Sequence, residues 1–271
     1  MNIENILEEI DRLKDLTKKL GISKEEEKFF QDDFNLRYTY ESNAIEGNTL
    51  TLMETKVVLE GITIGGKTLR EHFEVINHHS AIHYMEDLVR EKEPLNEYDI
   101  KSIHHLVLKG IDDDNAGKYR HCNVIIAGSK HIPPEHFEVH SKMQDFIKWY
   151  QKQEEHPIIK ASRAHAILVG IHPFIDGNGR TSRLVMNLEL LKAGYPAINI
   201  KHENKNDYFN ALELAQQGDF SKFDNLVAKY SLATLQEKIQ KLRNKMAHRI
   251  SPQVRAEQEK KAQKQGRGIK K

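Results

Sequence analysis

Residues 172–183 concentrate the groups that chemistry on a phosphate requires. This stretch reads His-Pro-Phe-Ile-Asp-Gly-Asn-Gly-Arg-Thr-Ser-Arg. Gly177 and Gly179 permit backbone conformations in which successive amide N–H groups converge on one anion. His172 can take a proton from a nucleophile, and Asp176 is the hard oxygen ligand that Mg²⁺ prefers. These residues predict a site for a polyphosphate and its metal ion.

The elements on either side place this turn at the start of a helix. Apolar residues recur at helical spacing before it, in 164–171, and after it, in 184–191. A helix N-terminus offers unpaired N–H groups and a favourable dipole to an anion. Arg180 and Arg183 are three residues apart, so they share a helix face and can bind further phosphate oxygens. Asn178 can donate its side-chain amide to another oxygen.

The whole stretch resembles the signature of the Fic family, His-x-Phe-x-(Asp/Glu)-Gly-Asn-Gly-Arg-x-x-Arg, at every defined position. Taken alone, the central Asp-Gly-Asn-Gly is typical of an ordinary turn, but the flanking histidine and arginines favour a catalytic site. Members of this family typically transfer AMP from ATP to a hydroxyl side chain of a target protein. The resemblance therefore implies ATP as a substrate, Mg²⁺ as the metal ion and a protein as the acceptor.

The resemblance also implies a role for each residue of the motif. His172 deprotonates the Ser, Thr or Tyr that attacks the α-phosphate, and Asp176 holds Mg²⁺ across the α- and β-phosphates. Catalysis of this kind depends on positioning and on charge stabilisation. The remaining groups bind phosphate oxygens: Asn178, the amides of 177–179, Arg180 and Arg183.

Gly179 separates two chemistries within the wider family. In the related Doc-type kinases a lysine replaces this glycine and the nucleotide donates its γ-phosphate, so Gly179 favours nucleotidyl transfer. Two alternatives stay open: a nucleotide-responsive binding protein with little catalysis, and transfer of another phosphate-containing group. The presence of both His172 and Asp176 favours an enzyme, because a binding protein does not need the base.

A second motif predicts autoinhibition. Residues 42–48, Ser-Asn-Ala-Ile-Glu-Gly-Asn, resemble the inhibitory pattern (Ser/Thr)-x-x-x-Glu-(Gly/Asn) of the Fic family. Ser42 and Glu46 are four apart and share a helix face, which by itself is also typical of a solvated helix. The resemblance implies that Glu46 pairs with Arg183 and takes the place of the γ-phosphate. It leaves open whether Glu46 also aligns a water that hydrolyses the AMP–protein bond.

Residues 117–140 predict a segment that docks the target protein. Val124, Ile125 and Ile126 form a short β-prone run before a Gly-Ser turn and two prolines, which indicates a β-hairpin or an extended flap. Such an edge can pair with a target through backbone hydrogen bonds, although an ordinary surface hairpin has the same pattern. The resemblance implies a flap at this position.

An aromatic pair predicts the adenine pocket. Residues 207–212, Asp-Tyr-Phe-Asn-Ala-Leu, resemble the Fic segment Tyr-(Tyr/Phe)-x-Ala-Leu that lines this pocket. We expect Tyr208 to contact the base and Phe209 to pack inward, although aromatic residues at a helix start are also typical of a core.

The whole pattern predicts an all-α protein, a Fic-like helical bundle with a small β-hairpin flap beside the active site. We expect an N-terminal helical segment with the inhibitory helix in 1–90, a catalytic core in 91–217, and a C-terminal helix with a loose basic tail in 218–271. Apolar periodicity and capping residues predict the following helices: 3–20, 24–46, 52–61, 69–91, 97–108, 139–154, the two motif helices, 206–217 and 220 to about 249.

Composition predicts neither a membrane nor a nucleic-acid partner. The chain has 271 residues, a net charge of +1 and 38% hydrophobic residues, enough for a sizeable core. No apolar run has the length of a signal peptide core or a membrane span, and the single cysteine excludes an internal disulfide, so we expect a cytoplasmic protein. Residues 236–271 carry twelve Lys or Arg against three Asp or Glu, but no aromatic residue for base stacking. Self-modification and a homo-oligomer stay open.

Overall fold

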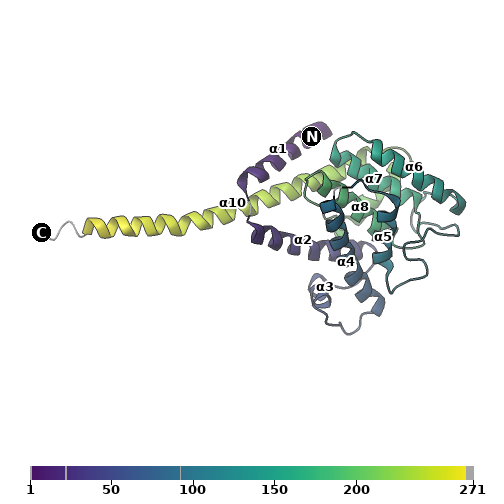
Figure 1. Ribbon diagram of the computed structural model, residues 1–271, viewed down its shortest axis with the longest axis horizontal. Coiled ribbons are helices and arrows are strands. Elements are labelled where there is room, and N and C mark those ends of the chain that lie inside the picture. The colour runs from purple at the N-terminus through teal and green to yellow at the C-terminus, as the bar shows by residue number, and fades with distance from the viewer. Residues whose placement is uncertain (1, 22, 92, 267–271) are drawn as a thin grey trace.

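The computed structural model describes residues 2–21, 23–91 and 93–266, which are mostly helical (Figure 1). No strand occurs among these residues, which confirms the all-α class. Two short 3-10 helices, η1 (His136–Glu138) and η2 (His202–Asn204), precede α6 and α9. The α-helices are α1 (Ile3–Leu20), α2 (Lys24–Ile45), α3 (Leu52–Leu59), α4 (Leu69–Glu91), α5 (Glu97–Leu108), α6 (Val139–Lys152), α7 (Pro157–Ile171), α8 (Asn178–Lys192), α9 (Lys205–Gln216) and α10 (Ser221–Gly266).

Helix α8 is the centre of the bundle. Its side chains are buried on every face, as is typical of a helix that is surrounded by others. Leu184 and Leu188 pack into one apolar cluster with α4, α5 and α6, whereas Met186 and Leu190 pack into a second one with α1, α9 and α10. The helix that follows the predicted phosphate turn is therefore held rigidly from both sides.

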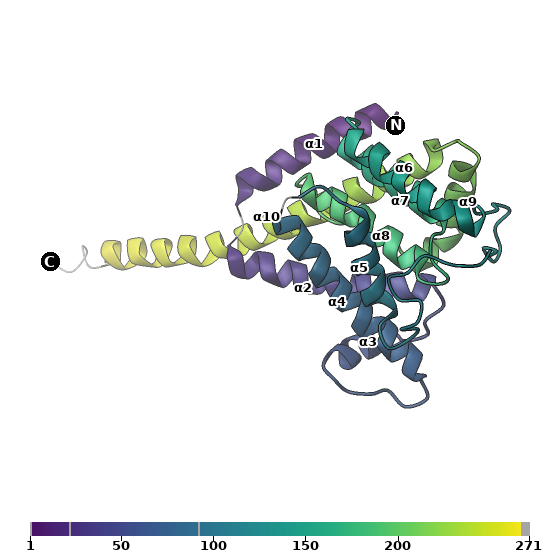
Figure 2. The ribbon, with the colours of Figure 1, turned by 45° about the vertical axis from the view of Figure 1, so that its right-hand side comes forward.

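The N-terminal helices lie against the rest of the molecule. Helix α1 runs along α10 in both views, with Ile6, Ile10 and Leu13 buried (Figure 2). Helix α2 contacts α4 and α8, and its C-terminal end carries the second motif. Helix α10 continues to Gly266, past the end expected near residue 249. None of the described helices is long and apolar enough to cross a bilayer.

Local signals start several helices where the sequence predicts. Asn96 caps α5, with its side chain accepting from the Asp99 amide at 3.1 Å while the Asp99 carboxylate accepts from the Asn96 amide at 3.1 Å. Ser23 and Glu26 form the same reciprocal box at the start of α2. Each box satisfies two N–H groups that the helix itself leaves unpaired.

The predicted β-hairpin does not form in the described structure. Residues 118–135 contain bends, a turn and irregular backbone without strand pairing. The buried Arg120 side chain supplies hydrogen bonds in place of strand pairing. Its Nε donates to the His172 carbonyl at 2.9 Å, its Nη1 to the Cys122 carbonyl at 3.0 Å, and its Nη2 to the Pro134 carbonyl. Proline has no N–H to donate, so Pro133 and Pro134 also disfavour pairing on that side. The segment is an irregular flap rather than a hairpin.

Candidate active site

His172 ends helix α7 in the left-handed conformation, with φ 50° and ψ 57°. It is the single non-glycine residue with positive φ among the described residues. Its Nδ1 lies 3.2 Å from the Val169 carbonyl, a distance at which Nδ1–H donates and Nε2 is left as a proton acceptor. Burial lowers the pKa of His172 below its usual value. The ring is therefore neutral at pH 7, the form that a general base requires.

The turn between α7 and α8 is closed by Asn178. Its Oδ1 accepts from the Phe174 amide at 3.0 Å, and its Nδ2 donates to the Phe174 carbonyl at 2.9 Å. The Phe174 ring is fully buried and stacks on His104 at a centroid separation of 3.6 Å. We expected the Asn178 amide to donate to a phosphate, but in this structure it is already used to shape the turn.

The two glycines of the turn have different roles. Gly177 starts α8 with φ 74°, and a Cβ there would lie 3.2 Å from Val107 and 3.3 Å from His104. Gly179 has no positive φ, yet a Cβ on it would lie 2.3 Å from Oε1 of Glu46. The carboxylate of Glu46 therefore lies against the backbone of the predicted anion site.

Arg183 joins the two motifs. Its Nη2 donates to Oε1 of Glu46 at 2.7 Å and to the Ser42 carbonyl at 2.8 Å, and its Nε donates to Oγ of Ser42 at 2.9 Å. The guanidinium is buried, with 1% of the side chain exposed. Burial acts to lower the pKa of Arg183, but Glu46, Tyr208 and Tyr38 together outweigh it and the pKa is raised. Ser42, Glu46 and Arg183 thus meet as the sequence predicts.

Asp176 and Arg180 form the other side of the site. Oδ1 of Asp176 accepts from the Gly177 amide at 2.6 Å and lies 3.4 Å from Nη2 of Arg180. Nη1 of Arg180 lies 3.4 Å from Oε1 of Glu74, and 2% of the Arg180 side chain is exposed. Burial acts to raise the pKa of Asp176, but Arg180, the Gly177 amide and Arg70 together lower it. The carboxylate is therefore ionised at neutral pH.

The comparisons with known proteins agree with this geometry. A model described as "Fic/DOC family" matches residues 94–190. Fic-1 from C. elegans is 32% identical in sequence and superposes with a TM-score of 0.81, over 90% of this chain and 73% of that one. The chain belongs to the Fic/DOC family. A Fic domain containing signaling protein from Bacteroides thetaiotaomicron superposes with a TM-score of 0.78 at 28% identity, over 90% of this chain and 97% of that chain.

Curated relatives of this Fic chain extend beyond the matched region. The protein adenylyltransferase Fic of Drosophila yakuba is 38% identical over 203 residues, which is 73% of this chain and 41% of that protein. The protein of the same name from Drosophila melanogaster is 35% identical over 236 residues, or 86% of this chain and 48% of that protein. The chain thus spans less than half the length of these curated relatives.

The Fic motif residues fit a magnesium ion that arrives with a nucleotide. Asp176 is ionised, and 41% of its side chain is exposed at the edge of the turn. Among the described residues no group of three or more His, Cys, Asp or Glu could form a protein cage for a metal. Mg²⁺ commonly binds one or two carboxylates and takes its other ligands from phosphates and water. The single carboxylate of Asp176, beside the turn that is predicted to bind phosphate, matches that pattern.

The structure contradicts the prediction that Phe209 packs inward, whereas the predicted contact between Tyr208 and the base stays a prediction. Tyr208 is 1% exposed, whereas Phe209 is 47% exposed. The Tyr208 hydroxyl accepts from Nη1 of Arg183 at 3.3 Å and lies 2.9 Å from Nε2 of His165. Tyr208 therefore packs inward and supports Arg183, because its side of α9 faces α7 and α10. Phe209 is the residue whose ring remains accessible.

The flap begins beside the turn that carries His172, because Arg120 bonds to the carbonyls of His172 and Pro173. His131 Nε2 is 2.8 Å from the Gly170 carbonyl in α7, and the Lys130 amide donates to Glu213 in α9 at 3.0 Å. Val124 and Ile126 are partly covered, whereas Ile125 is 92% exposed. The flap is thus anchored on α7 and on α9, and it presents an apolar side chain outward.

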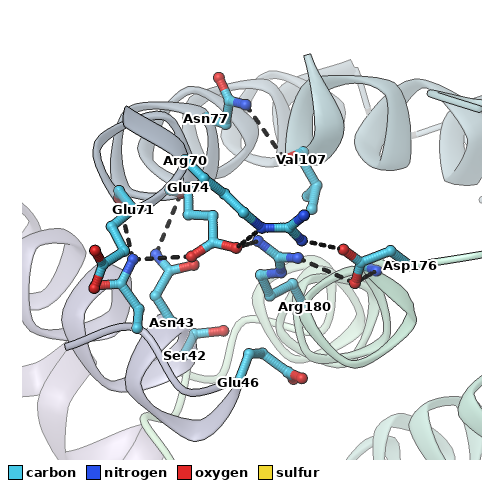
Figure 3. Close-up of polar contacts among 12 residues, drawn as sticks. Ser42, Asn43, Glu46, Arg70, Glu71, Glu74, Asn77, Val107, Asp176 and Arg180 are labelled. Atoms are coloured by element: carbon cyan, nitrogen blue, oxygen red, sulfur yellow. Dashed lines mark hydrogen bonds and ion pairs between the residues drawn. The ribbon is translucent and has the colours of Figure 1, made fainter. Parts of the chain in front are cut away.

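Several residues that contact this Fic site were not predicted from the sequence. The ring of His104 is buried, and its Nε2 donates to the Asp176 carbonyl at 2.9 Å while its Nδ1 accepts from the Gly117 amide at 2.9 Å. Arg70 and Glu74 come from α4 and contact Asp176 and Arg180 (Figure 3). No local pattern identifies them, since the pairing partner lies about a hundred residues away in the chain.

Proposed function

We propose that the protein transfers AMP from ATP to a Ser, Thr or Tyr hydroxyl of a protein, and that Glu46 restrains this reaction. The observation that carries the proposal is the carboxylate of Glu46, which lies on the Gly179 backbone and pairs with Arg183. A negative charge held at that position supports a site built for phosphate oxygens. The charge of Glu46 also competes with the phosphate oxygens for that position.

The neutral His172 ring supports the chemical step. Nε2 takes the hydroxyl proton, the hydroxyl oxygen bonds to the α-phosphorus, and the bond from that phosphorus to the bridging oxygen breaks. Pyrophosphate leaves, and the proton remains on His172 until solvent accepts it. When bound, Mg²⁺ held by Asp176 would offset the negative charge of the phosphates. The amides at the start of α8, together with Arg180 and Arg183, orient the chain of phosphates.

The flap supports the proposal that the acceptor is a protein. Its 118–135 backbone is not paired in a sheet, and the run Val124, Ile125 and Ile126 can therefore pair with an extended segment of the target. Such docking depends little on target side chains, so it also permits modification of a second copy of this chain or of a homo-oligomeric partner. We infer a cytoplasmic location because the reaction consumes ATP and Cys122 is an exposed free thiol.

Substitution Glu46→Gly tests the proposal. We expect AMP incorporation from α-labelled ATP and Mg²⁺ to rise about ten- to hundred-fold, because a hydrogen bond to a charged group contributes about 1.5–3 kcal/mol. Intact-mass analysis in a host lysate should show a gain of one AMP on the modified protein. His172→Ala in the same background should abolish the gain, because the base is then missing.

Glu60→Gly is the matched control. Glu60 also follows the last residue of a helix, with φ −79° and ψ 1° against −83° and 1° for Glu46, but it lies at the end of α3. It should leave incorporation unchanged. Label retained from γ-labelled ATP alone would contradict AMP transfer. Following the label after ATP is removed, with and without Glu46, also tests whether this carboxylate promotes hydrolysis of the AMP ester.

A further inference from the structure

Arg70 contacts the carboxylate that is proposed to bind the metal ion. Arg70 is the second residue of α4, and its Nη2 donates to Oδ2 of Asp176 (Figure 3). The other oxygen, Oδ1, is already occupied by the Gly177 amide at 2.6 Å and faces Arg180 at 3.4 Å. Oδ2 is thus the oxygen that a cation would take, and Arg70 lies on it.

The two arginines at Asp176 differ in their freedom. The side chain of Arg180 is 2% exposed, whereas that of Arg70 is 55% exposed. An exposed guanidinium on a flexible stem can leave its partner at little cost, because exposed ion pairs contribute little free energy. Arg180 is enclosed by the bundle and stays in place. Arg70 is the movable cation of the pair.

Glu74 aims Arg70 at Asp176. Oε1 of Glu74 accepts from Nε of Arg70 at 3.1 Å, and the same oxygen lies 3.4 Å from Nη1 of Arg180. Oε2 of Glu74 accepts from Nδ2 of Asn48 at 2.9 Å, which holds the carboxylate from the other side. Arg70 therefore has a second anchor that remains available when its Nη2 leaves Asp176.

We propose that Arg70 is a residue of the metal site, a role that rests on the Mg²⁺–ATP chemistry above. It neutralises Oδ2 of Asp176 when no cation is bound, and it must give up this oxygen when Mg²⁺ binds. Two cations cannot share one oxygen without strong repulsion. Arg70 therefore competes with the metal and lowers the apparent metal affinity of Asp176, while Glu74 keeps the released guanidinium close to the phosphates.

A Mn²⁺ titration of the full chain without nucleotide tests this role. Bound Mn²⁺ broadens the NMR signals of nearby amides, so the signals of Asp176 and Gly177 report binding directly and independently of activity. Arg70→Gln should reach half broadening at a Mn²⁺ concentration about two- to five-fold lower than wild type, since an exposed pair is worth about 0.2–1 kcal/mol. Arg70→Lys keeps the charge and should stay near wild type.

Two controls separate the possible failures. Arg90→Gln removes an exposed arginine of the same helix that pairs with Asp87 instead, and it should not change the titration. Asp176→Asn should remove the broadening. If broadening requires Asp176 but Arg70→Gln matches wild type or binds Mn²⁺ more weakly, the competition is overturned and the proposed function stands. If neither wild type nor Arg70→Gln shows broadening that depends on Asp176, both the competition and the metal assignment fall.

Discussion

His172 is held in a conformation that few side chains adopt. A non-glycine residue in the left-handed region costs about 1–2 kcal/mol, so neighbouring contacts must enforce it. The His172 amide donates to the Leu168 carbonyl at 3.2 Å, and its carbonyl accepts from Arg120 at 2.9 Å. Both backbone groups are thus hydrogen-bonded within the protein, and the ring is held by the contact between Nδ1 and the Val169 carbonyl. Arg120, from the start of the flap, is thus a positioning residue for the base.

The lowered pKa of His172 predicts the pH dependence of AMP transfer. Burial lowers this pKa below the ordinary 6.5, and the base acts only when it is deprotonated. Activity should therefore be kept as pH falls to 6.5 and be lost only at lower pH, as the ring takes up a proton. The measurement is kcat/KM against pH for the Glu46→Gly variant, which reports the free enzyme. An acid limb centred above pH 6.5 would contradict the neutral, buried base.

At the level of single residues, adjacency in the sequence predicts the site only in part. His172, Asp176, Gly177, Gly179, Arg180 and Arg183 lie in one short run, so their proximity follows from one turn. Tyr208 and Phe209 are also adjacent, but which ring is buried depends on how α9 is rotated against α7 and α10. Arg70 meets Asp176 across 106 positions, and only the packing of α4 on α8 brings them together.

Helix α4 is the element that positions the end of α2 that carries Glu46, the proposed inhibitory residue. Nδ2 of Asn43 donates to the Glu74 carbonyl at 3.3 Å, within the last turns of α2. Just beyond the helix, Nδ2 of Asn48 donates to the Glu71 carbonyl at 3.1 Å and to the Glu74 carboxylate at 2.9 Å. Glu46 lies between these two asparagines. Its carboxylate is therefore directed at Arg183 by two anchors on a different helix.

Removing one anchor should loosen the inhibition without abolishing it. Asn48→Ala eliminates both hydrogen bonds from this side chain to α4 and the one that it accepts from the Leu50 amide. We therefore expect AMP incorporation to rise, but less than with Glu46→Gly. In the double variant the asparagine change should add nothing, since it acts through Glu46. Labelling rates of the four proteins measure this coupling. Asn225→Ala, which removes a side-chain hydrogen bond within α10, is the control. An additive effect in the double variant would show that Asn48 acts by another route.

Helices were easier to predict than the flap for a physical reason. Apolar spacing and capping boxes act within a few residues, so α1, α4 and α5 begin and end close to the predicted positions. A hairpin was predicted from the same kind of local signal, the run Val124 to Ile126 and a turn. The carbonyls of the flap are instead bonded by Arg120, whose guanidinium also reaches His172, and a local pattern cannot predict such a contact.

Over the part of the molecule that the structure describes, the bundle encloses His78, His104 and His165 in neutral form. Burial lowers the pKa of His104 to about 4, and it lowers the pKa of His78 and His165 well below 6.5. His104 needs the neutral form, because its Nδ1 accepts from the Gly117 amide while its Nε2 donates to the Asp176 carbonyl. Protonating Nδ1 would replace that hydrogen bond with a clash of two donors. The hydrogen bonds of His104 to Gly117 and Asp176 therefore depend on the protonation state of this buried histidine.

This linkage predicts that the protein loses stability in mild acid. A histidine whose pKa is lower in the folded state takes up protons first in the unfolded chain, so its contribution to stability is present above pH 6.5 and is lost as pH falls toward the folded pKa. For His104, with a folded pKa of about 4, the loss between pH 6.5 and pH 4 is about 3 kcal/mol in the free energy of unfolding. Urea denaturation at successive pH values measures it. His104→Gln lacks the titrating ring, so its free energy of unfolding should be lower than that of wild type at pH 7 but should fall less steeply with acid. Equal slopes for the two proteins would mean that His104 does not couple the turn to pH.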